Sequence, residues 1–444
     1  MDAGSLPREH TTAMKPKRPP IPGIEASPEA PRWRETVPRL VALLAPGLLV
    51  AGLAWRYFDS YDQLLLALDR ASALGPCHGP EGARPLCDFA NHYYPQGRAL
   101  ADAPVALPGF FYSAFFALWM RLYGLFAYPV ARALWAAVIL AAALTLTLAP
   151  LWREFRRSLV GCAVHSLVFA VSLPLWHDLA FGQVSSLLTV LVLLAFLCYG
   201  RQWPALAAVL LGLAASIKFY PALFAVYFAL RRDRRALITF SCTVLVCTGV
   251  LPLLVLGETG LLGFYRSWWT GIDQLARGTA ANVFSNFMAN VVARLLTGRI
   301  EPASLLYQAV VFVGLGLAGF HAWLAWRLVR DRPDVSPRAA LMLGLAAIPL
   351  VVRSCWVHYF VFLPLLQGYV LEGRARDGVS RLARWLCTVP VALSVGLVSV
   401  PFLMLVRDFR YYQTGMLFWA TAILLPGLYL RVLGETAAGE AGGA

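Results

Sequence analysis

A carboxylate and an imidazole lie four residues apart in the segment CDFANHYYPQGRAL, residues 87–100. If this segment is helical, Asp88 and His92 share one face of the helix, with Asn91 close to both. A carboxylate beside an imidazole can act as a general base, because each group changes the proton affinity of the other. The alternative is that Asp88 only caps the start of the helix.

Two other groups of polar residues compete with that pair. Asp59 and Asp62 follow the first apolar segment, where solvated carboxylates at a membrane interface are the simpler explanation. His177, Asp178 and Gln183 fall in WHDLAFGQ, predicted as a short external turn between two apolar segments. Such a turn is often only a helix cap with a solvated end. A His–Asp pair at a membrane edge is nevertheless uncommon enough to be a candidate site.

Isolated cations mark a third group. Lys218 interrupts the apolar segment 204–231 just before Pro221, so the segment is predicted to break there into two short helices. A lone lysine in this position is costly unless it binds an anion, such as a lipid phosphate, or extends to the interface. Arg353 and His358 lie in VVRSCWVHYF, at the outer end of two apolar segments. Arginine suits bidentate phosphate recognition, so Lys218 and Arg353 are predicted to line one phosphate site.

Asn286 and Arg294 belong to SNFMANVVARLL, which is predicted to form an amphipathic helix on the outer membrane surface. There it could contact lipid headgroups or sugar hydroxyls. The chain has no Walker loop, no GxGxxG before a strand, no HExxH and no metal-spaced set of Cys and His. Nucleotide chemistry, a cofactor and a bound metal are therefore not expected.

The chain around these residues is strongly apolar. Hydrophobic residues make up 59% of its 444 residues, and the mean hydropathy is +0.64. Apolar runs of about 15–25 residues predict an all-α protein that crosses the membrane many times. The net charge of +14 does not indicate nucleic-acid binding, because the basic residues cluster beside apolar segments, as they do in cytoplasmic loops.

Loop charge also predicts the topology. Basic residues precede the first predicted span, 38–56, so its start is predicted to be cytoplasmic and residues 57–127 external. A crossing at 109–127 would leave the later run of arginines outside, so this segment is predicted to be a re-entrant or interfacial helix. About twelve spans result, in one domain at 38–432 with a second external loop at 257–301, between disordered cytoplasmic tails at 1–37 and 433–444.

Two cysteines flank a stretch rich in glycine and proline in the first external loop. Cys77 and Cys87 enclose HGPEGARPL. If the loop faces an oxidising compartment, they are predicted to form a disulfide, although two free thiols remain the alternative.

Five segments in order resemble the polyprenol-phosphate-dependent membrane glycosyltransferases of family 87, in the GT-C superfamily. The order and spacing hold across about residues 40–375, which makes the set specific although no single motif decides. The segments are DFANHYYPQGRAL followed by GFFYSAFFALW, FGQVSSLL (181–188), AASIKFYPALFAVYFALRRDRRAL (214–237), NVFSNFMANVVARL (282–295) and SCWVHYF (354–360).

The resemblance implies a GT-C fold with an external layer of juxtamembrane helices and an active site at the external face. A sugar, typically mannose, would move with inversion from a polyprenyl phosphate to a glycolipid or glycan acceptor. Asp88 would be the general base, with His92 beside it, and the family's lysine and histidine fall on Lys218 and His358, expected at the donor phosphate. Acceptor or secondary positions would be Asn91, Tyr93, Tyr112, His177, Asp178, Gln183, Asn286 and Arg294.

This chain departs from the family pattern at two motifs and in one loop. Tyr359 stands where the family has a second histidine, and Tyr112-Ser113-Ala114 stands where it has a YPP turn. The stretch 57–87 is longer than usual, which could reshape acceptor specificity. The expected location is a bacterial inner membrane, with chemistry on the periplasmic side. The rival functions are a transporter or flippase for lipid-linked sugars, and a silent scaffold protein.

Overall fold

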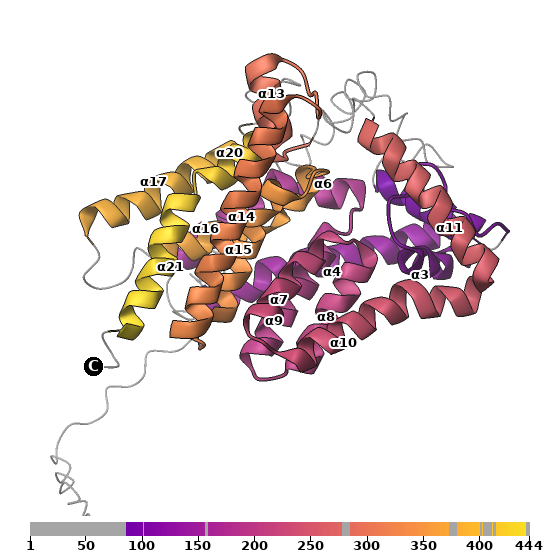
Figure 1. Ribbon diagram of the computed structural model, residues 1–444, viewed down its shortest axis with the longest axis horizontal. Coiled ribbons are helices and arrows are strands. Elements are labelled where there is room, and N and C mark those ends of the chain that lie inside the picture. Colours follow the sequence, from indigo (N-terminus) through magenta and orange to yellow (C-terminus); the bar gives the residue numbers. More distant parts are fainter. Residues whose placement is uncertain are drawn as a thin grey trace, which may run out of the picture.

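The computed structural model describes residues 86–100, 102–155, 159–277, 285–334, 336–372, 380–399, 402, 411 and 414–440. In this part of the chain the only extended pairing is an isolated antiparallel bridge between Ser172 and Ser399, and the rest consists of helices and their connections (Figure 1). In chain order, with η for π or 3₁₀ turns, the elements are η1 (Phe89–Tyr93), α2 (Tyr94–Ala99), α3 (Ala114–Gly124), α4 (Tyr128–Phe155), α5 (Leu159–Ala170), α6 (Leu173–Phe181), α7 (Ser185–Gly200), α8 (Pro204–Ile217), η2 (Tyr220–Ala225), α9 (Val226–Leu230), α10 (Arg234–Leu245), η3 (Val246–Val250), α11 (Leu251–Arg277), α13 (Met288–Thr297), α14 (Leu305–Asp331), α15 (Ser336–Val351), η4 (Val357–Phe362), α16 (Leu363–Glu372), α17 (Arg381–Leu397), α20 (Met416–Ala422) and α21 (Leu425–Glu440).

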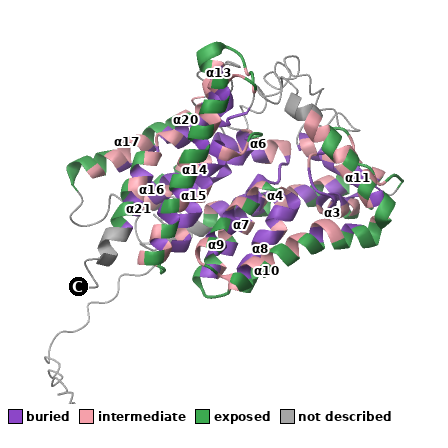
Figure 2. Ribbon diagram, viewed as in Figure 1, coloured by how far each residue is buried: buried purple, intermediate pink, exposed green. Residues whose placement is uncertain are grey.

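Several helices have the length and composition of membrane spans. Figure 2 shows exposed residues along α10, α11 and α14, and only 11% of the most apolar stretch of α10 and α11 is buried. An apolar surface of this kind suits lipid rather than water. Four such helices are found among the described residues: Tyr128–Leu148, Arg234–Asp273, Leu305–Asp331 and Met416–Glu435. The number is five if α6 and α7, which are bent by 117° relative to each other, count as one crossing.

The expected number of about twelve spans is therefore not confirmed, because several apolar segments form short or broken helices. The segment 204–231 does break at Lys218, as predicted: α8 ends there, and Lys218 is extended, with φ −144° and ψ 135°. The α3 helix, at 11 residues, is about 16 Å long and cannot cross a ~30 Å hydrocarbon layer. The first predicted span, 38–56, lies outside the described residues.

The predicted external turn at 176–183 is wrong for most of its length. Residues 173–181 form α6, which begins with Pro174 in its first turn and ends at Gly182. Gly182 has φ 66°, a left-handed conformation that glycine adopts without strain and that commonly ends helices. The true turn is therefore confined to the residues between α6 and α7.

The C-terminal boundary is also corrected. The disordered tail was expected from residue 433, but α21 continues to Glu440. Arg431 and Glu435, which are 8% and 7% exposed, anchor this last helix. Arg431 Nη2 lies 3.1 Å from a carboxylate oxygen of Glu372, and its Nε lies 3.2 Å from Glu435 Oε1.

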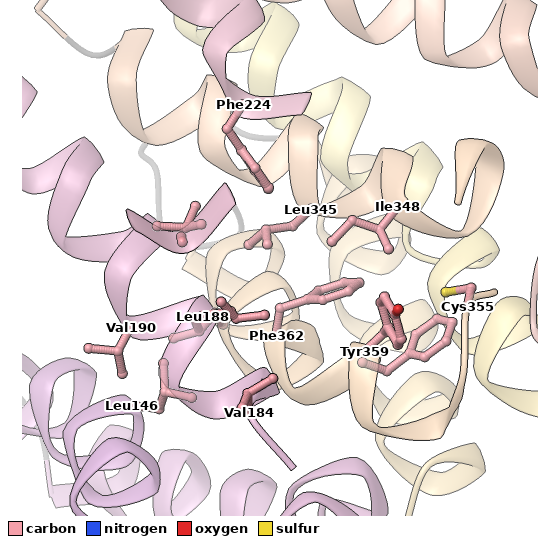
Figure 3. Close-up of a cluster of buried hydrophobic side chains, with 14 of the residues drawn as sticks. Leu146, Val184, Leu188, Val190, Phe224, Leu345, Ile348, Cys355, Tyr359 and Phe362 are labelled. Carbon is pink, nitrogen blue, oxygen red and sulfur yellow. The ribbon is translucent and has the colours of Figure 1, made fainter. Parts of the chain in front are cut away.

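A shared apolar core joins the two sides of the molecule. In Figure 1, α7, α8 and α10 lie on one side and α14, α15 and α21 on the other. Figure 3 shows the buried side chains between them, contributed by α4, α7, η2, α15 and the loop and turn around η4. They include Leu146, Val184, Leu188, Val190, Phe224, Leu345, Ile348, Cys355, Tyr359 and Phe362.

The long helical segment α10–η3–α11 bends back over the molecule. Its bend is at Gly257, whose φ of 71° and ψ of 173° are not helical. Residues 234–256 before the bend extend about 35 Å at 1.5 Å per residue. Beyond the bend, α11 packs on α3 (Figure 1), and Ser267 Oγ accepts a 2.8 Å hydrogen bond from the Ala106 amide.

Candidate active site

Asp88 lies immediately before a π turn. In η1 the Tyr94 amide donates to the Phe89 carbonyl, five residues back, so the turn is wider than an α-helical one. Because the turn is wider, His92 and Tyr93, four and five residues after Asp88, lie on the same side of the helix as Asp88. Phe89 fixes the turn by stacking on Trp135, with ring centroids 5.7 Å apart. The sequence at 87–100 is compatible with a helix, but it gave no sign of the π geometry.

The alternative role of Asp88 as a helix cap is not seen. Its side chain makes no capping hydrogen bond, and it forms no ion pair or hydrogen bond with the described residues. Burial raises the pKa of Asp88 above the ordinary value of a carboxyl group, although His92 and Lys218 act in the opposite direction. A partly buried carboxylate without a partner, beside two basic groups, has the properties of a proton acceptor.

His92 is held by a glycine that the sequence analysis missed. Gly109 has φ 83°, and a Cβ atom placed on it would lie 2.6 Å from Cε1 of the His92 ring. Only glycine fits both the conformation and the contact. The Pro108–Gly109 dipeptide, a common turn signal, could have pointed to this position. His92 Nδ1 is buried without a hydrogen-bond partner among the described residues.

Three predicted secondary residues meet in one hydrogen-bonded group. The hydroxyl oxygens of Tyr93 and Tyr112 are 2.6 Å apart, and they contact Gln183 Oε1 at 3.1 and 2.9 Å. All three residues are buried. The group ties η1 to the loop before α3 and to the turn before α7, so it fixes the position of the helix that carries Asp88.

Lys218 brings a cation to the same region. Its Nζ lies 4.2 Å from the ring centroid of Tyr359 and 5.0 Å from that of Tyr112. No carboxylate of the described residues forms an ion pair with it. Burial lowers the pKa of Lys218 to about 8, although Asp88 and Asp178 act in the opposite direction. Two aromatic faces stabilise the ammonium group and leave its hydrogens available to an anion.

The position of Lys218 is set from α3. Ser113 caps that helix by accepting a hydrogen bond from the Phe116 amide, and its hydroxyl donates to the carbonyl of Ser216, two residues before Lys218. Ser113 stands in the motif where the chain departs from the family's YPP turn. The departure therefore supplies a direct link between the first external loop and the lysine.

Asp178 has a structural explanation. Its two carboxylate oxygens accept hydrogen bonds from the amides of Ser185 and Ser186, at 3.1 and 3.0 Å. These amides are in the first turn of α7, where backbone N–H groups need acceptors. Asp178 is fully buried and accepts two hydrogen bonds. It therefore caps α7, which is the structural role considered for it in the sequence analysis.

His177 and His358 come together between α6 and η4. Their ring centroids are 5.8 Å apart, and His177 stacks on Phe181 at 4.2 Å. The His358 ring is 5.1 Å from that of Tyr359, the residue that also faces Lys218. Tyr359 thus connects the lysine to the histidine pair.

Arg353, Asn286 and Arg294 lie around a second loop. Arg353 is exposed and its side chain hydrogen-bonds Tyr307. The Asn286 amide donates to the Cys355 carbonyl at 2.6 Å, and Arg294 donates to the Ser285 carbonyl at 3.0 Å. The Asn286 bond and a hydrogen bond from the Ser285 hydroxyl to the Arg353 carbonyl attach the segment before α13 to the loop before η4. A phosphate shared by Arg353 and Lys218 stays a prediction.

The remaining predicted residues concern the first external loop. Asn91 Nδ2 lies 3.5 Å from the sulfur of Cys87, and Cys87 is disulfide-bonded. Its predicted partner Cys77, and the rival carboxylates Asp59 and Asp62, lie outside the described residues. Within the described ranges no three potential metal ligands converge, so the expected absence of a metal stays a prediction.

Comparison with known proteins places these segments in a family. The chain is 31% identical over 238 residues to a polyprenol-phosphate-mannose-dependent alpha-(1-2)-phosphatidylinositol mannoside mannosyltransferase of Mycolicibacterium smegmatis, covering 50% of this chain and 49% of that protein. A Mycobacterium tuberculosis protein of the same name is 30% identical over 47% of this chain and 46% of its own length. The chain thus spans about half the length of these curated relatives.

A third relative is matched over more of its length. It is a polyprenol-phosphate-mannose-dependent alpha-(1-2)-phosphatidylinositol pentamannoside mannosyltransferase of M. tuberculosis, 27% identical over 85% of this chain and 87% of that protein. No solved structure matches the chain significantly. The model of glycosyltransferase family 87 matches residues 110–354, more than half of the chain, a range that includes Tyr112, Gln183 and Lys218. The chain belongs to glycosyltransferase family 87.

Proposed function

We propose that this protein transfers a mannosyl group from a polyprenyl-phosphate donor to a hydroxyl of a glycolipid or glycan acceptor. The observation that carries the proposal is that Asp88 and Lys218, from distant parts of the chain, influence each other electrostatically, while neither has an ion-pair partner among the residues that the structure describes. Transfer of a sugar from a phosphate requires a base that takes the proton of the acceptor hydroxyl and a cation that stabilises the leaving phosphate. The donor is inferred from the names of the relatives.

The proposed reaction proceeds with inversion in one displacement. Asp88 takes the proton of the acceptor hydroxyl as its oxygen bonds to the anomeric carbon. The bond from that carbon to the phosphate oxygen breaks, and polyprenyl phosphate leaves as an anion. Lys218, with Arg353 predicted beside it, neutralises the charge that develops there, and His358 is predicted to donate a hydrogen bond to the same phosphate. Because the leaving group is already a stable anion, no general acid is required.

The proposal extends to topology and location. We infer a GT-C fold with about twelve crossings of a bacterial inner membrane and a site on the periplasmic side. Its support is the basic character of the opposite loops, which typically remain cytoplasmic. The relatives' printed names include phosphatidylinositol mannosides, and a related glycolipid is the proposed acceptor class. Family membership argues against the transporter alternative.

The test is transfer of labelled sugar by the purified protein from a panel of polyprenyl-phosphate sugars, with mass analysis of the products. Asp88→Asn removes the base but keeps the size of the side chain, and we expect transfer to fall by about 10²–10⁴-fold. Donor binding and thermal stability should stay near wild type.

Asp102→Asn is the matched control, because Asp102 is exposed in the same loop and should retain full activity. An active Asp88→Asn protein together with an inactive Asp59→Asn protein would move the base assignment to Asp59. Absence of transfer from every lipid-linked sugar by the wild type would reject the proposed reaction.

A further inference from the structure

Four side-chain nitrogen atoms in one cluster are buried without a hydrogen-bond partner among the residues that the structure describes. They are Nδ1 of His177, both ring nitrogens of His358, and Nε1 of Trp356. The rings are neighbours: His358 lies 5.8 Å from the centroids of both His177 and Trp356. Buried polar atoms are nearly always paired in folded proteins. A cluster of unpaired ones between α6 and η4 therefore indicates the place of a polar ligand.

The chemistry of these atoms restricts the ligand. His358 is 1% exposed, and burial together with the Lys218 cation lowers its pKa well below the ordinary value. Its ring is therefore neutral, with one nitrogen that donates and one that accepts. The indole of Trp356 only donates. An ionised phosphate only accepts, so it would leave one His358 nitrogen unpaired, whereas a sugar hydroxyl both donates and accepts.

The position of the cluster fits a hexose beside the phosphate. The Tyr359 ring lies 4.2 Å from Lys218 Nζ and 5.1 Å from the His358 ring. In a sugar phosphate the hexose is bonded directly to a phosphate oxygen. A phosphate held by Lys218 thus places the hydroxyls of its own sugar next to the adjoining cluster.

We propose that His358, with His177 and Trp356, binds the hydroxyls of the donor hexose, while Lys218 binds its phosphate. This inference rests on the proposed function, and it moves His358 from the phosphate to the sugar. The three residues then determine which sugar the enzyme accepts from a polyprenyl phosphate.

The experiment compares two probes, polyprenyl phosphate and the same lipid carrying mannose, by equilibrium binding to the full-length protein in detergent. In His358→Leu we expect mannosyl-lipid binding to weaken about tenfold or more, toward the affinity of the bare phosphate. Binding of the bare phosphate should change less than about twofold. Lys218→Met should weaken both probes by a similar factor.

Two further variants separate binding from folding. His358→Gln keeps one donor and one acceptor and should recover part of the mannosyl-lipid affinity, whereas Trp356→Phe removes one donor and should lose less than His358→Leu. Preference for mannosyl over glucosyl lipid should fall in the same order. Elution volume and melting temperature identify any variant that fails to fold.

Three outcomes distinguish the hypotheses. Equal loss of both probes in His358→Leu would make His358 a phosphate ligand and overturn this inference. Unchanged affinity and unchanged sugar preference in His358→Leu and Trp356→Phe would place the donor hexose elsewhere and also overturn it. A wild-type protein that binds neither lipid would instead reject the proposed function.

Discussion

Asp88 and Lys218 are opposite charges that influence each other without forming an ion pair. Each is partly buried, and within the described part of the chain neither makes the ion pair that a buried charge normally requires. An ion pair would stabilise the fold but would occupy both groups. Kept apart, the carboxylate can accept a proton while the ammonium group binds an anion.

The two shifted pKa values predict a bell-shaped pH profile of kcat/KM for the donor. Activity is lost as pH falls through the pKa of Asp88, which burial raises above the usual carboxyl range, because the base becomes protonated. It is lost again as pH rises through about 8, because Lys218 loses its proton. Initial rates at saturating acceptor and low donor would measure both limbs.

Lys218→Arg is the matched variant. Arginine keeps its charge across this range, so the alkaline limb should disappear or move upward even if the maximal rate falls. The acid limb should stay in place. An alkaline limb that remains near pH 8 in Lys218→Arg would show that another group titrates there.

The helices around the site were predictable where one residue type decides the local structure. Pro221 and a lone lysine predicted the break at Lys218, and the structure shows it. The π turn after Asp88 has no compositional signal, because it depends on Phe89 stacking on Trp135 from another helix. Likewise His177 and Asp178 were predicted to lie in a turn. They lie on α6, which packs on η4, and that tertiary contact cannot be seen in the local sequence.

A prediction at this scale concerns Gly109, which lies in the loop between α2 and α3 and contacts His92 of η1. Gly109→Ala would place a methyl group against His92 and force a residue with a side chain into φ 83°. We expect a loss of about 1–3 kcal/mol of stability and reduced kcat through displacement of His92. Thermal or denaturant unfolding in detergent, together with transfer assays, measures the two effects.

Gly316→Ala serves as its control. A Cβ at Gly316, inside α14, would meet no atom within 4 Å, and alanine is the better helix former by about 0.5–1 kcal/mol. The control should be neutral or slightly stabilising. A Gly109→Ala protein as stable and active as this control would show that neither the backbone strain nor the His92 contact matters.

For the whole molecule, hydropathy identified a helical membrane protein, but the structure confirms only four or five long apolar helices among the described residues. Hydropathy measures apolar stretches, and it does not show where such a stretch folds into two short helices, as residues 159–181 do in forming α5 and α6. It also missed the end of α21, because the ion pairs that hold this helix come from a distant part of the chain. Arg431, for example, binds Glu372 of α16.

The ion pairs of α21 provide a test of how the last helix is attached. Arg431→Met would leave the carboxylates of Glu435 and Glu372 without their buried partner and remove a guanidinium 3.6 Å from the Tyr369 ring centroid. We expect a loss of about 3–5 kcal/mol, seen as a lower melting temperature. Arg299→Met is the control, because its pair with Glu301 is exposed and contributes at most about 1 kcal/mol. Equal melting temperatures for the two variants would contradict a stabilising role for this cluster.

The bend at Gly257 also relates the protein to the bilayer around it. The roughly 35 Å of helix before the bend is close to the ~30 Å hydrocarbon thickness, while α11 beyond it turns back over α3. Bilayers that are thicker or thinner than this helix create hydrophobic mismatch, which tilts helices or deforms lipid. Because α11 and α3 adjoin the loop of Asp88, such a mismatch would change the height of the proposed base above the acyl chains. Lipid chain length is therefore a variable that should affect the proposed transfer reaction.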